Sequence, residues 1–260
     1  MTTAVPPADV VARLRAAGCV FAEEEAALLV GAAGSPGELE RMVAGRVAGT
    51  PLEVLVGWAE FCGLHVVVLP GVFVPRRRTE LMARHATRLA TRGSVVVDLC
   101  CGTGAVGAAV SASVPGAEVY AADLDPAAVS CARRNLPPER VFGGDLYDAL
   151  PGALLGRVDV LACNAPYVPT DEISLMPPEA RLHEHRVALD GGVDGLDIQR
   201  RVVAGAAAWL APGGHLLVES SVAQAPVTAR LMSAAGLVPE VVHDEEVGGT
   251  LVVGAGPGPG

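Results

Sequence analysis

The chain has 260 residues, a formal net charge of −10 and an apolar content of 51%. These values predict a globular protein with one enzyme-sized domain, a small appendage and a sizeable apolar core. All nineteen basic residues are arginines, which excludes lysine chemistry, and residues 93–260 hold nine arginines against twenty acids, a net charge of −11. Because nucleic-acid binding depends on many basic contacts, this acidic part argues against a nucleic acid as the partner.

The sequence has no apolar stretch long enough to span a membrane, and no basic region followed by an apolar block at its start. We therefore expect a cytoplasmic protein with no membrane partner. The six cysteines show no Cys-x-x-Cys spacing, and we expect reduced, mostly buried thiols. The segment His183-Glu184-His185 lacks the spacing of a zinc site, so we expect no metal.

The amino-terminal part shows the spacing of apolar residues that is typical of helices, interrupted by glycine and proline. Three helices are predicted, and together they form a helical head over residues 1–50. Residues 51–78 contain short valine-rich runs separated by glycines, which predicts a hairpin-like connector. The predicted helices cover residues 8–17, 22–33 and 36–48.

The remaining chain, residues 79–254, alternates short apolar runs with helical patterns, which is typical of an α/β domain with a mostly parallel sheet. The last two runs are separated by only five residues and therefore form a hairpin. Residues 255–260 are predicted to be a disordered tail. The seven expected strands cover residues 95–98, 118–123, 140–145, 158–164, 214–220, 239–244 and 250–254.

A glycine turn follows the first of these strands. Asp98 ends the strand, and Gly102 and Gly104 would let the backbone pass close to a ligand before a helix begins. Asp123 ends the next strand, where a carboxylate can bind ribose hydroxyls. The alternative is a tight strand-to-helix turn without a ligand and a solvated acid at a strand end. We favour a nucleoside-containing cofactor.

The fourth strand ends in Asn164-Ala165-Pro166-Tyr167. The carboxyl ends of parallel strands are where open α/β sheets bind ligands, and an amide oxygen there can accept a hydrogen bond from an NH2 group of a substrate. The alternative is an asparagine that caps its own turn. We favour a role in binding a planar amide or amine nucleophile.

With these motifs the sequence resembles the glutamine side-chain methyltransferases of peptide release factors, a family of class I S-adenosylmethionine-dependent methyltransferases. Four segments carry the resemblance in the family's order: 46–52 (Arg-Val-Ala-Gly-Thr-Pro-Leu), 73–80 (Phe-Val-Pro-Arg-x-x-Thr-Glu), 164–167 (Asn-Ala-Pro-Tyr, where the family has Asn-Pro-Pro-Tyr) and 188–196 (Ala-Leu-Asp-Gly-Gly-Val-Asp-Gly-Leu). The resemblance implies a Rossmann-like sheet of seven strands with the last one antiparallel, and a head that helps to choose the substrate.

The resemblance also implies roles for individual residues. Asn164 and the carbonyl of Ala165 would hold the two N–H groups of a glutamine amide, in a loop shaped by Pro166, while Tyr167 would pack beside that amide. S-adenosylmethionine would be bound by residues of the strand ends and of the segment before the first helix of the main domain. These are Phe73, Arg76, Asp98, Cys100, Gly102, Gly104, Asp123, Leu124, Asp145, Leu146 and Asn164.

Several positions depart from the family's pattern and indicate a divergent paralogue. Cys100 stands where the first glycine of the turn is usual, and Arg77 and Arg78 stand where proline and glutamate are common. Glu184 and Gln199 match weaker family positions, and we interpret both as surface polar residues. The family's closing Asp-x-x-Gly-x-x-Arg pattern lacks its arginine here, in residues 244–250.

The sequence thus predicts a methyltransferase that acts on a glutamine amide in a protein such as a peptide chain release factor. One alternative is methylation of the amino groups of adenine or cytosine, or of a small-molecule amide. Another is a non-catalytic module that binds S-adenosylmethionine or a translation factor, since Cys100 and Ala165 could mark a degraded site.

Overall fold

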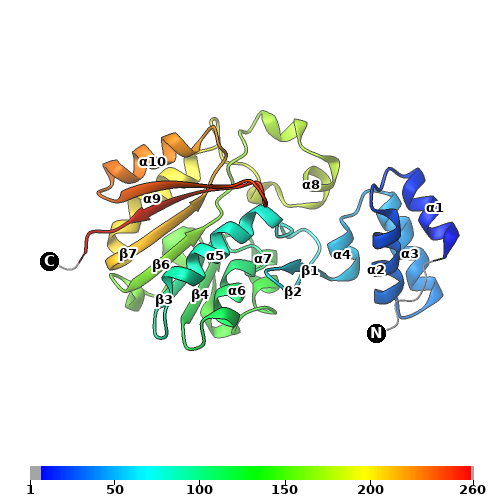
Figure 1. The fold of residues 1–260 in the computed structure, drawn as a ribbon, viewed down its shortest axis with the longest axis horizontal. Helices are drawn as coiled ribbons and strands as arrows, with labels where there is room; N and C mark the ends of the chain where they lie inside the picture. The colour runs from blue at the N-terminus through cyan, green and yellow to red at the C-terminus, as the bar shows by residue number, and fades with distance from the viewer. Residues whose placement is uncertain (1–6, 259–260) are drawn as a thin grey trace.

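The structure is a computed structural model that describes residues 7–258. The chain begins with the predicted helical head, which lies at one end of the molecule (Figure 1). Its helices are α1 (Ala8–Ala16), α2 (Ala22–Ala32) and α3 (Pro36–Val47). Helix α3 begins after Ser35, whose hydroxyl accepts a hydrogen bond from the backbone N–H of Glu38, with Pro36 in the first turn. The three predicted helices are confirmed.

A fourth helix, α4 (Leu52–Val56), lies where the sequence predicts only a hairpin-like connector. Its Leu52 and Leu55 pack against the core of the head, which includes Leu14 and Leu29. Five residues are too few to show a helical period in the sequence, because a period needs at least two turns. The sequence-based description of this segment was therefore wrong at its start.

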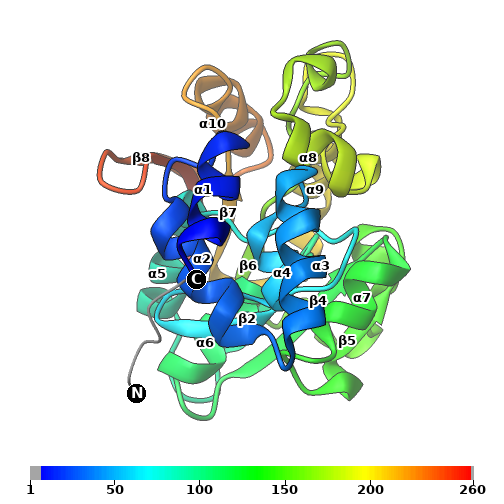
Figure 2. The same cartoon turned by 90° about the vertical axis from the view of Figure 1, so that its right-hand side faces the viewer.

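The expected hairpin follows α4. Strands β1 (Trp58–Phe61) and β2 (Leu64–Val67) pair antiparallel, and the two residues between them, Cys62 and Gly63, both have positive φ, as tight hairpin turns require. Phe61 is fully buried in the core of the main domain. The hairpin therefore attaches the head to the sheet domain, and Figure 2 shows both from the side of the head.

The main domain contains a seven-stranded sheet in the order β5-β4-β3-β6-β7-β9-β8. The first five strands of this order run parallel, whereas the last strand of the chain, β9, lies antiparallel between β7 and β8. The predicted fold class is confirmed. The strands are β3 (Val95–Leu99), β4 (Glu118–Asp123), β5 (Val141–Gly143), β6 (Val158–Cys163), β7 (Leu210–Glu219), β8 (Val238–Asp244) and β9 (Gly249–Ala255).

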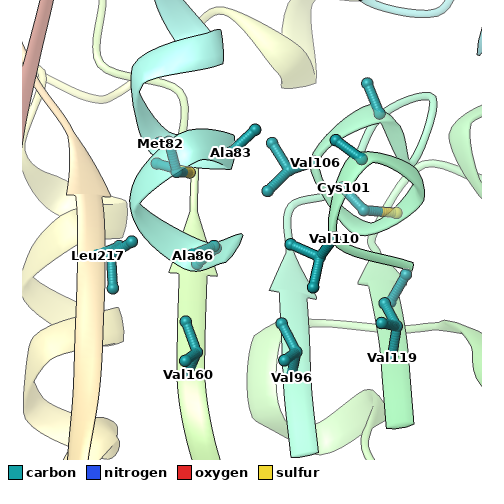
Figure 3. Close-up of a cluster of buried hydrophobic side chains, with 14 of the residues drawn as sticks. Met82, Ala83, Ala86, Val96, Cys101, Val106, Val110, Val119, Val160 and Leu217 are labelled. Carbon is teal, nitrogen blue, oxygen red and sulfur yellow. The ribbon is translucent and has the colours of Figure 1, made fainter. Parts of the chain in front are cut away.

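Helices cover both faces of this sheet, which explains why its central strands are almost continuously apolar. On one face, Val96 and Val160 of the sheet pack against α5 and α6 (Figure 3). On the other face, Val97 and Leu161 pack against α9 and α10. The helices are α5 (Glu80–Leu89), α6 (Ala105–Ser113) and α7 (Pro126–Ala132) on the first face, and α9 (Asp197–Trp209) and α10 (Ala225–Ala234) on the second.

The segment between β6 and α9 forms a lobe near the carboxyl ends of the parallel strands. It contains helix α8 (Pro178–His183), two short 3-10 helices at Glu172–Leu175 and Arg186–Ala188, and the glycine-rich stretch 191–195. Further 3-10 helices lie at Arg77–Thr79, Pro138–Arg140, Leu146–Ala149 and Gly152–Leu154. Two of them, Arg77–Thr79 and Leu146–Ala149, supply residues to the same end of the sheet, where the candidate site lies.

The carboxyl terminus is more ordered than predicted. Strand β9 continues to Ala255, the N–H of Gly256 donates to the carbonyl of Gly214 at 2.8 Å, and the N–H of Gly213 donates to the carbonyl of Pro257 at 2.7 Å. The prediction of a disordered tail is therefore wrong for residues 255–257, because backbone pairing does not depend on side-chain composition. Residues 259–260 of the predicted tail lie outside the described part of the chain.

The glycine turn before α6 packs tightly against Ala132 and Leu136, and this packing can be tested. Gly104 has φ +75°, and an added Cβ would lie 3.0 Å from Cδ1 of Leu136 and 3.2 Å from Cβ of Ala132. Gly93 has a similar φ of +87° but no atom within 4 Å of that position. We expect Gly93→Ala to lower the free energy of unfolding by about 1–2 kcal/mol, and Gly104→Ala by roughly 1–3 kcal/mol more. Urea unfolding measures both, and equal losses would contradict the tight packing.

Candidate active site

A cavity of about 480 Å³ lies at the carboxyl ends of β3, β4 and β6. This volume falls in the range of about 300–1,000 Å³ that is typical of small-molecule sites. Most of the residues that the sequence predicts for the site line it: Phe73, Asp98, Cys100, Gly102, Asp123, Leu124, Asp145, Leu146, Asn164, Ala165, Pro166 and Tyr167. Of the predicted residues, Arg76 and Gly104 do not line it.

The acids at the ends of β3 and β4 fix the shape of the glycine turn. Asp98 is 3% exposed, and its Oδ2 accepts a hydrogen bond of 2.9 Å from the N–H of Gly107 in α6. One oxygen of Asp123 accepts from the N–H of Gly102 at 2.8 Å, and the other from the N–H of Asp125 at 2.9 Å. Each carboxyl group therefore holds backbone beside the cavity while also facing it.

Burial changes the acidity of these two groups. It raises the pKa of Asp98 to about 7, although the N–H of Gly107 acts in the opposite direction. Burial also raises the pKa of Asp123, against the effect of the N–H groups of Asp125 and Gly102. A ligand that carries positive charge would favour the ionised form of both acids. Carboxylates at these strand ends can accept hydrogen bonds from the hydroxyls of a ribose, and their negative charge favours a sulfonium. Both properties fit a cofactor that contains a ribose and a sulfonium.

Cys100 fits the turn without blocking it. Its φ is +58°, a left-handed conformation that costs roughly 1–2 kcal/mol for a residue other than glycine. Its side chain packs against the apolar core on the α9 side of the sheet, next to Cys163. A hydrogen bond with Cys163, together with burial, raises the pKa of the Cys100 thiol well above its usual value. The thiol is thus neutral and is part of the wall of the cavity.

The two predicted residues outside the lining act through their neighbours. Arg76 forms an ion pair with Glu184 of the lobe, and its guanidinium carbon lies 4.9 Å from the ring centroid of Phe73. It thereby holds Phe73 at the cavity. Gly104 supplies the left-handed residue from which α6 begins. Neither Arg76 nor Gly104 needs to touch a ligand in order to shape the cavity.

The part of the cavity that contains Leu124, Asp145 and Leu146 combines apolar and charged groups. Leu124 is 54% exposed at the end of β4, and Leu146 has φ +49°, which is unusual for leucine. Asp145 lines the cavity, but one of its oxygens accepts a hydrogen bond of 2.7 Å from Arg201. The exposed leucine side chain offers an apolar surface for a planar ring.

Residues 164–167 follow β6 and are called the acceptor loop below. A residue from another segment orients the first of them, Asn164. Nδ2 of Asn164 donates to Oγ1 of Thr79 at 3.3 Å. Thr79 is 5% exposed, and its hydroxyl does not cap helix α5. With its NH2 group directed at Thr79, Asn164 can present its amide oxygen as a hydrogen-bond acceptor. The next residue, Ala165, is 1% exposed and lines the cavity.

Tyr167 is held by a buried carboxylate at the end of β7. Its hydroxyl donates to Oε1 of Glu219 at 3.3 Å, and Nε of Arg78 donates to the same oxygen at 3.1 Å. Burial, reinforced by the charge of Glu219, raises the pKa of Tyr167 to about 12. The tyrosine is therefore a neutral donor that is fixed beside the acceptor loop.

The glycine-rich stretch 191–195 lies directly against this loop. A Cβ on Gly191 would come within 2.7 Å of the carbonyl oxygen of Pro166, and one on Gly195 within 2.3 Å of the carbonyl oxygen of Tyr167. The N–H of Gly191 donates to the carbonyl of Val168, and the N–H of Val168 donates to the carbonyl of Leu189, just before the stretch. These contacts explain why the resemblance in residues 188–196 accompanies that in residues 164–167.

Several functional candidates were missed in the sequence. Thr79, Arg78 and Glu219 contact the acceptor loop, although nothing in their local pattern indicates their partners. Glu184 and Gln199 were interpreted as surface polar residues, which is wrong: they are 5% and 0% exposed. Glu184 accepts hydrogen bonds from Arg76 and Val74, and Gln199 accepts one from Thr228. Their match to the family's pattern was the available signal.

Within residues 7–258, no group of three or more His, Cys, Asp or Glu side chains is placed to hold a metal ion. His185 and Glu184 have separate partners, Asp125 and Arg76. All six cysteines are free thiols. No helix in the described part of the chain is both long and apolar enough to cross a membrane.

Comparison with known proteins agrees with this geometry. The family described as "Methyltransferase small domain" matches residues 63–192. A methyltransferase from Pyrococcus furiosus has a similar structure, with a TM-score of 0.56 and 17% identity, over 75% of this chain and 90% of that one. The chain is thus a class I S-adenosylmethionine-dependent methyltransferase.

The curated relatives narrow this class. A release factor glutamine methyltransferase from Geobacter sulfurreducens is 37% identical over 199 residues, which are 75% of this chain and 69% of the relative. The chain belongs to the release factor glutamine methyltransferase family. A relative from Streptomyces pristinaespiralis, named 4-amino-L-phenylalanine/4-methylamino-L-phenylalanine methyltransferase, is 36% identical over 223 residues, 78% of this chain and 76% of that one.

Asp98 should make stability depend on pH. Its pKa is about 7 in the folded protein and about 3.9 in an unfolded chain, so the folded state binds the additional proton between these values. The free energy of unfolding should therefore fall by up to roughly 4 kcal/mol from pH 4 to pH 7 through this group. Asn at this position does not titrate. As the pH rises from 4 to 7, we expect the free energy of unfolding of Asp98→Asn, measured with urea, to increase relative to that of the parent protein. A difference between the two proteins that does not change with pH would contradict the raised pKa of Asp98.

Thr79 should be a positioning residue for Asn164. Thr79→Val removes the hydroxyl that accepts from Nδ2 of Asn164, whereas Thr79→Ser keeps it. Because a misplaced acceptor group slows transfer without touching the cofactor, we expect Thr79→Val to lower kcat roughly 10- to 100-fold, with cofactor affinity unchanged in calorimetry. Thr79→Ser should retain most activity. Equal rates for both variants would show that the contact has no role.

Proposed function

We propose that the protein transfers a methyl group from S-adenosylmethionine to the side-chain amide nitrogen of a glutamine in a protein, with a peptide chain release factor as the first candidate. The observation that carries this proposal is the orientation of Asn164. Its NH2 group is used on Thr79, which leaves its oxygen for an N–H donor in the cavity. Relatives with release factor names support the choice of substrate.

S-adenosylmethionine, when bound, supplies a methyl group on a sulfonium. The lone pair of the acceptor nitrogen forms the new C–N bond, and the electron pair of the broken C–S bond stays on sulfur. The nitrogen then loses one proton to solvent. Asp123 would hold the ribose, and Asp98 would add negative charge near the cationic part. Asn164 Oδ1 and the carbonyl of Ala165 would accept the two N–H groups of the amide. The enclosing lobe limits the access of water.

The helical head supports a protein as the acceptor. Arg46 of α3 forms ion pairs with Glu25 of α2 and with Glu179 of α8, and its side chain is only 12% exposed. This link joins the head to the lobe that covers the site. The head is thereby linked to the lobe whose residues line the cavity, so a protein acceptor has a surface beyond the cavity to bind.

The direct test is transfer of labelled methyl groups to purified release factors. A release factor whose candidate glutamine is replaced by alanine serves as the control for the site of transfer. We expect labelling of the first and not of the second. The variant Asn164→Ala should lose at least about 100-fold in rate but bind S-adenosylmethionine within a few fold of the parent protein. Equal loss of binding and transfer would contradict the role of Asn164.

A second candidate acceptor is a small molecule with an amino or amide group. The relative from Streptomyces pristinaespiralis is named for methylation of an amino acid, and its match covers 78% of this chain. If release factors are not labelled, free amino acids with an NH2 group on the side chain are the next acceptors to assay. Labelling of these alone would establish the second candidate.

A further inference from the structure

Arg78 occupies an unusual position at the acceptor end of the cavity. It lies in the 3-10 helix Arg77–Thr79, directly before the threonine that holds Asn164. Its guanidinium carbon is 5.9 Å from the ring centroid of Tyr167, and its side chain is 41% exposed and lines the cavity. A permanent positive charge therefore lies close to Tyr167 and directly before the threonine that contacts Asn164.

The binding capacity of Arg78 is only partly used. A guanidinium has five N–H donors in a planar fork. In the described residues, Nε donates to Oε1 of Glu219, and the group also contacts the hydroxyl of Tyr167. These two contacts fix the guanidinium while leaving donors of its terminal nitrogens for another group. A free pair of donors in this geometry matches the two oxygens of a carboxylate.

Glu219 makes this arrangement stable. It is 2% exposed, and its second oxygen, Oε2, is buried without a hydrogen-bond partner in the described structure. A buried carboxylate needs a nearby cation, and Arg78 is the ion-pair partner that is found there. The arginine is therefore paired with a buried carboxylate, whereas Arg77 is 68% exposed and its partner Glu246 is 83% exposed.

We propose that Arg78 binds a carboxylate of the methyl acceptor and so selects acceptors that carry one near the NH2 group. This inference rests on the proposed use of the cavity for an acceptor beside Asn164. The carboxylate has two possible sources, the α-carboxylate of a free amino acid or an acidic side chain beside the methylated glutamine of a peptide. The contacts of Arg78 with Tyr167 and Glu219 place it on the acceptor side of the cavity, away from Asp123.

The test uses binding, so that it does not depend on turnover. The protein is loaded with S-adenosylhomocysteine and titrated calorimetrically with two matched pairs: free glutamine against glutaminamide, and a short peptide with Gln-Glu against the same peptide with Gln-Gln. We expect the carboxylate member of at least one pair to bind at least about tenfold more tightly, as charge-assisted hydrogen bonds allow. The pair that discriminates identifies the source of the carboxylate.

Arg78→Gln should reduce this preference to less than about twofold, whereas the neighbouring Arg77→Gln should retain it. If Arg78→Gln does not fold, because Glu219 is left unpaired, the double variant Arg78→Gln/Glu219→Gln removes both charges and serves instead. Affinity for S-adenosylhomocysteine should remain unchanged in each variant.

Three results would overturn the inference: equal binding within both pairs, a preference that survives the loss of Arg78, or a loss that is confined to cofactor affinity. Failure to bind either carboxylate ligand would also count against it. Each of these outcomes is separate from the release factor assay. Labelled release factor with no carboxylate preference would leave the proposed function intact, whereas a carboxylate preference without release factor labelling would leave this inference intact.

Discussion

The acceptor site depends on the close contact between the glycine-rich stretch 191–195 and the loop that follows β6. Side chains at Gly191 or Gly195 would collide with the carbonyl oxygens of Pro166 and Tyr167. This contact, with the hydrogen bond from Gln224 to the carbonyl of Tyr167, sets the path of the loop from outside. The replacement of a proline by Ala165 then removes one local restraint, worth about 0.4–1 kcal/mol of chain entropy, while the external contacts remain.

Buried acids recur around this loop, and each has a different partner. Asp98 accepts a hydrogen bond from a backbone N–H group of α6. Glu184 forms an ion pair with Arg76, and Glu219 forms one with Arg78. Burial raises the pKa of Asp98 to about 7 and also raises the pKa of Glu184, against the effect of Arg76. Buried carboxyl groups are rare in proteins because the loss of their hydration lowers the free energy of unfolding. Their concentration at one end of one sheet is characteristic of a functional site.

The parts of the fold that were predictable depend on local pattern. Short apolar runs separated by helical patterns predicted all seven strands, and the rule that ligands bind at the carboxyl ends of parallel strands predicted that Asp123 and Asn164 lie at the same edge of the sheet. What could not be predicted depends on contacts between distant segments. The partner of Thr79 is 85 positions away, and the partner of Arg78 is 141 positions away. Local sequence also could not show that the Cys100 thiol lies next to Cys163.

The pair formed by Arg78 and Glu219 shows why a departure from a family pattern must be considered together with its surroundings. A glutamate at position 78, which is common in the family, would lie beside Glu219 in this chain. Two neighbouring carboxylates repel each other, and Glu219 would lose the cation that Arg78 supplies in this chain. Glu219 also accepts the hydrogen bond of Tyr167. The identity of residue 78 is therefore coupled to the position of the tyrosine, and arginine is the choice that gives Glu219 an ion-pair partner while adding donors to the cavity.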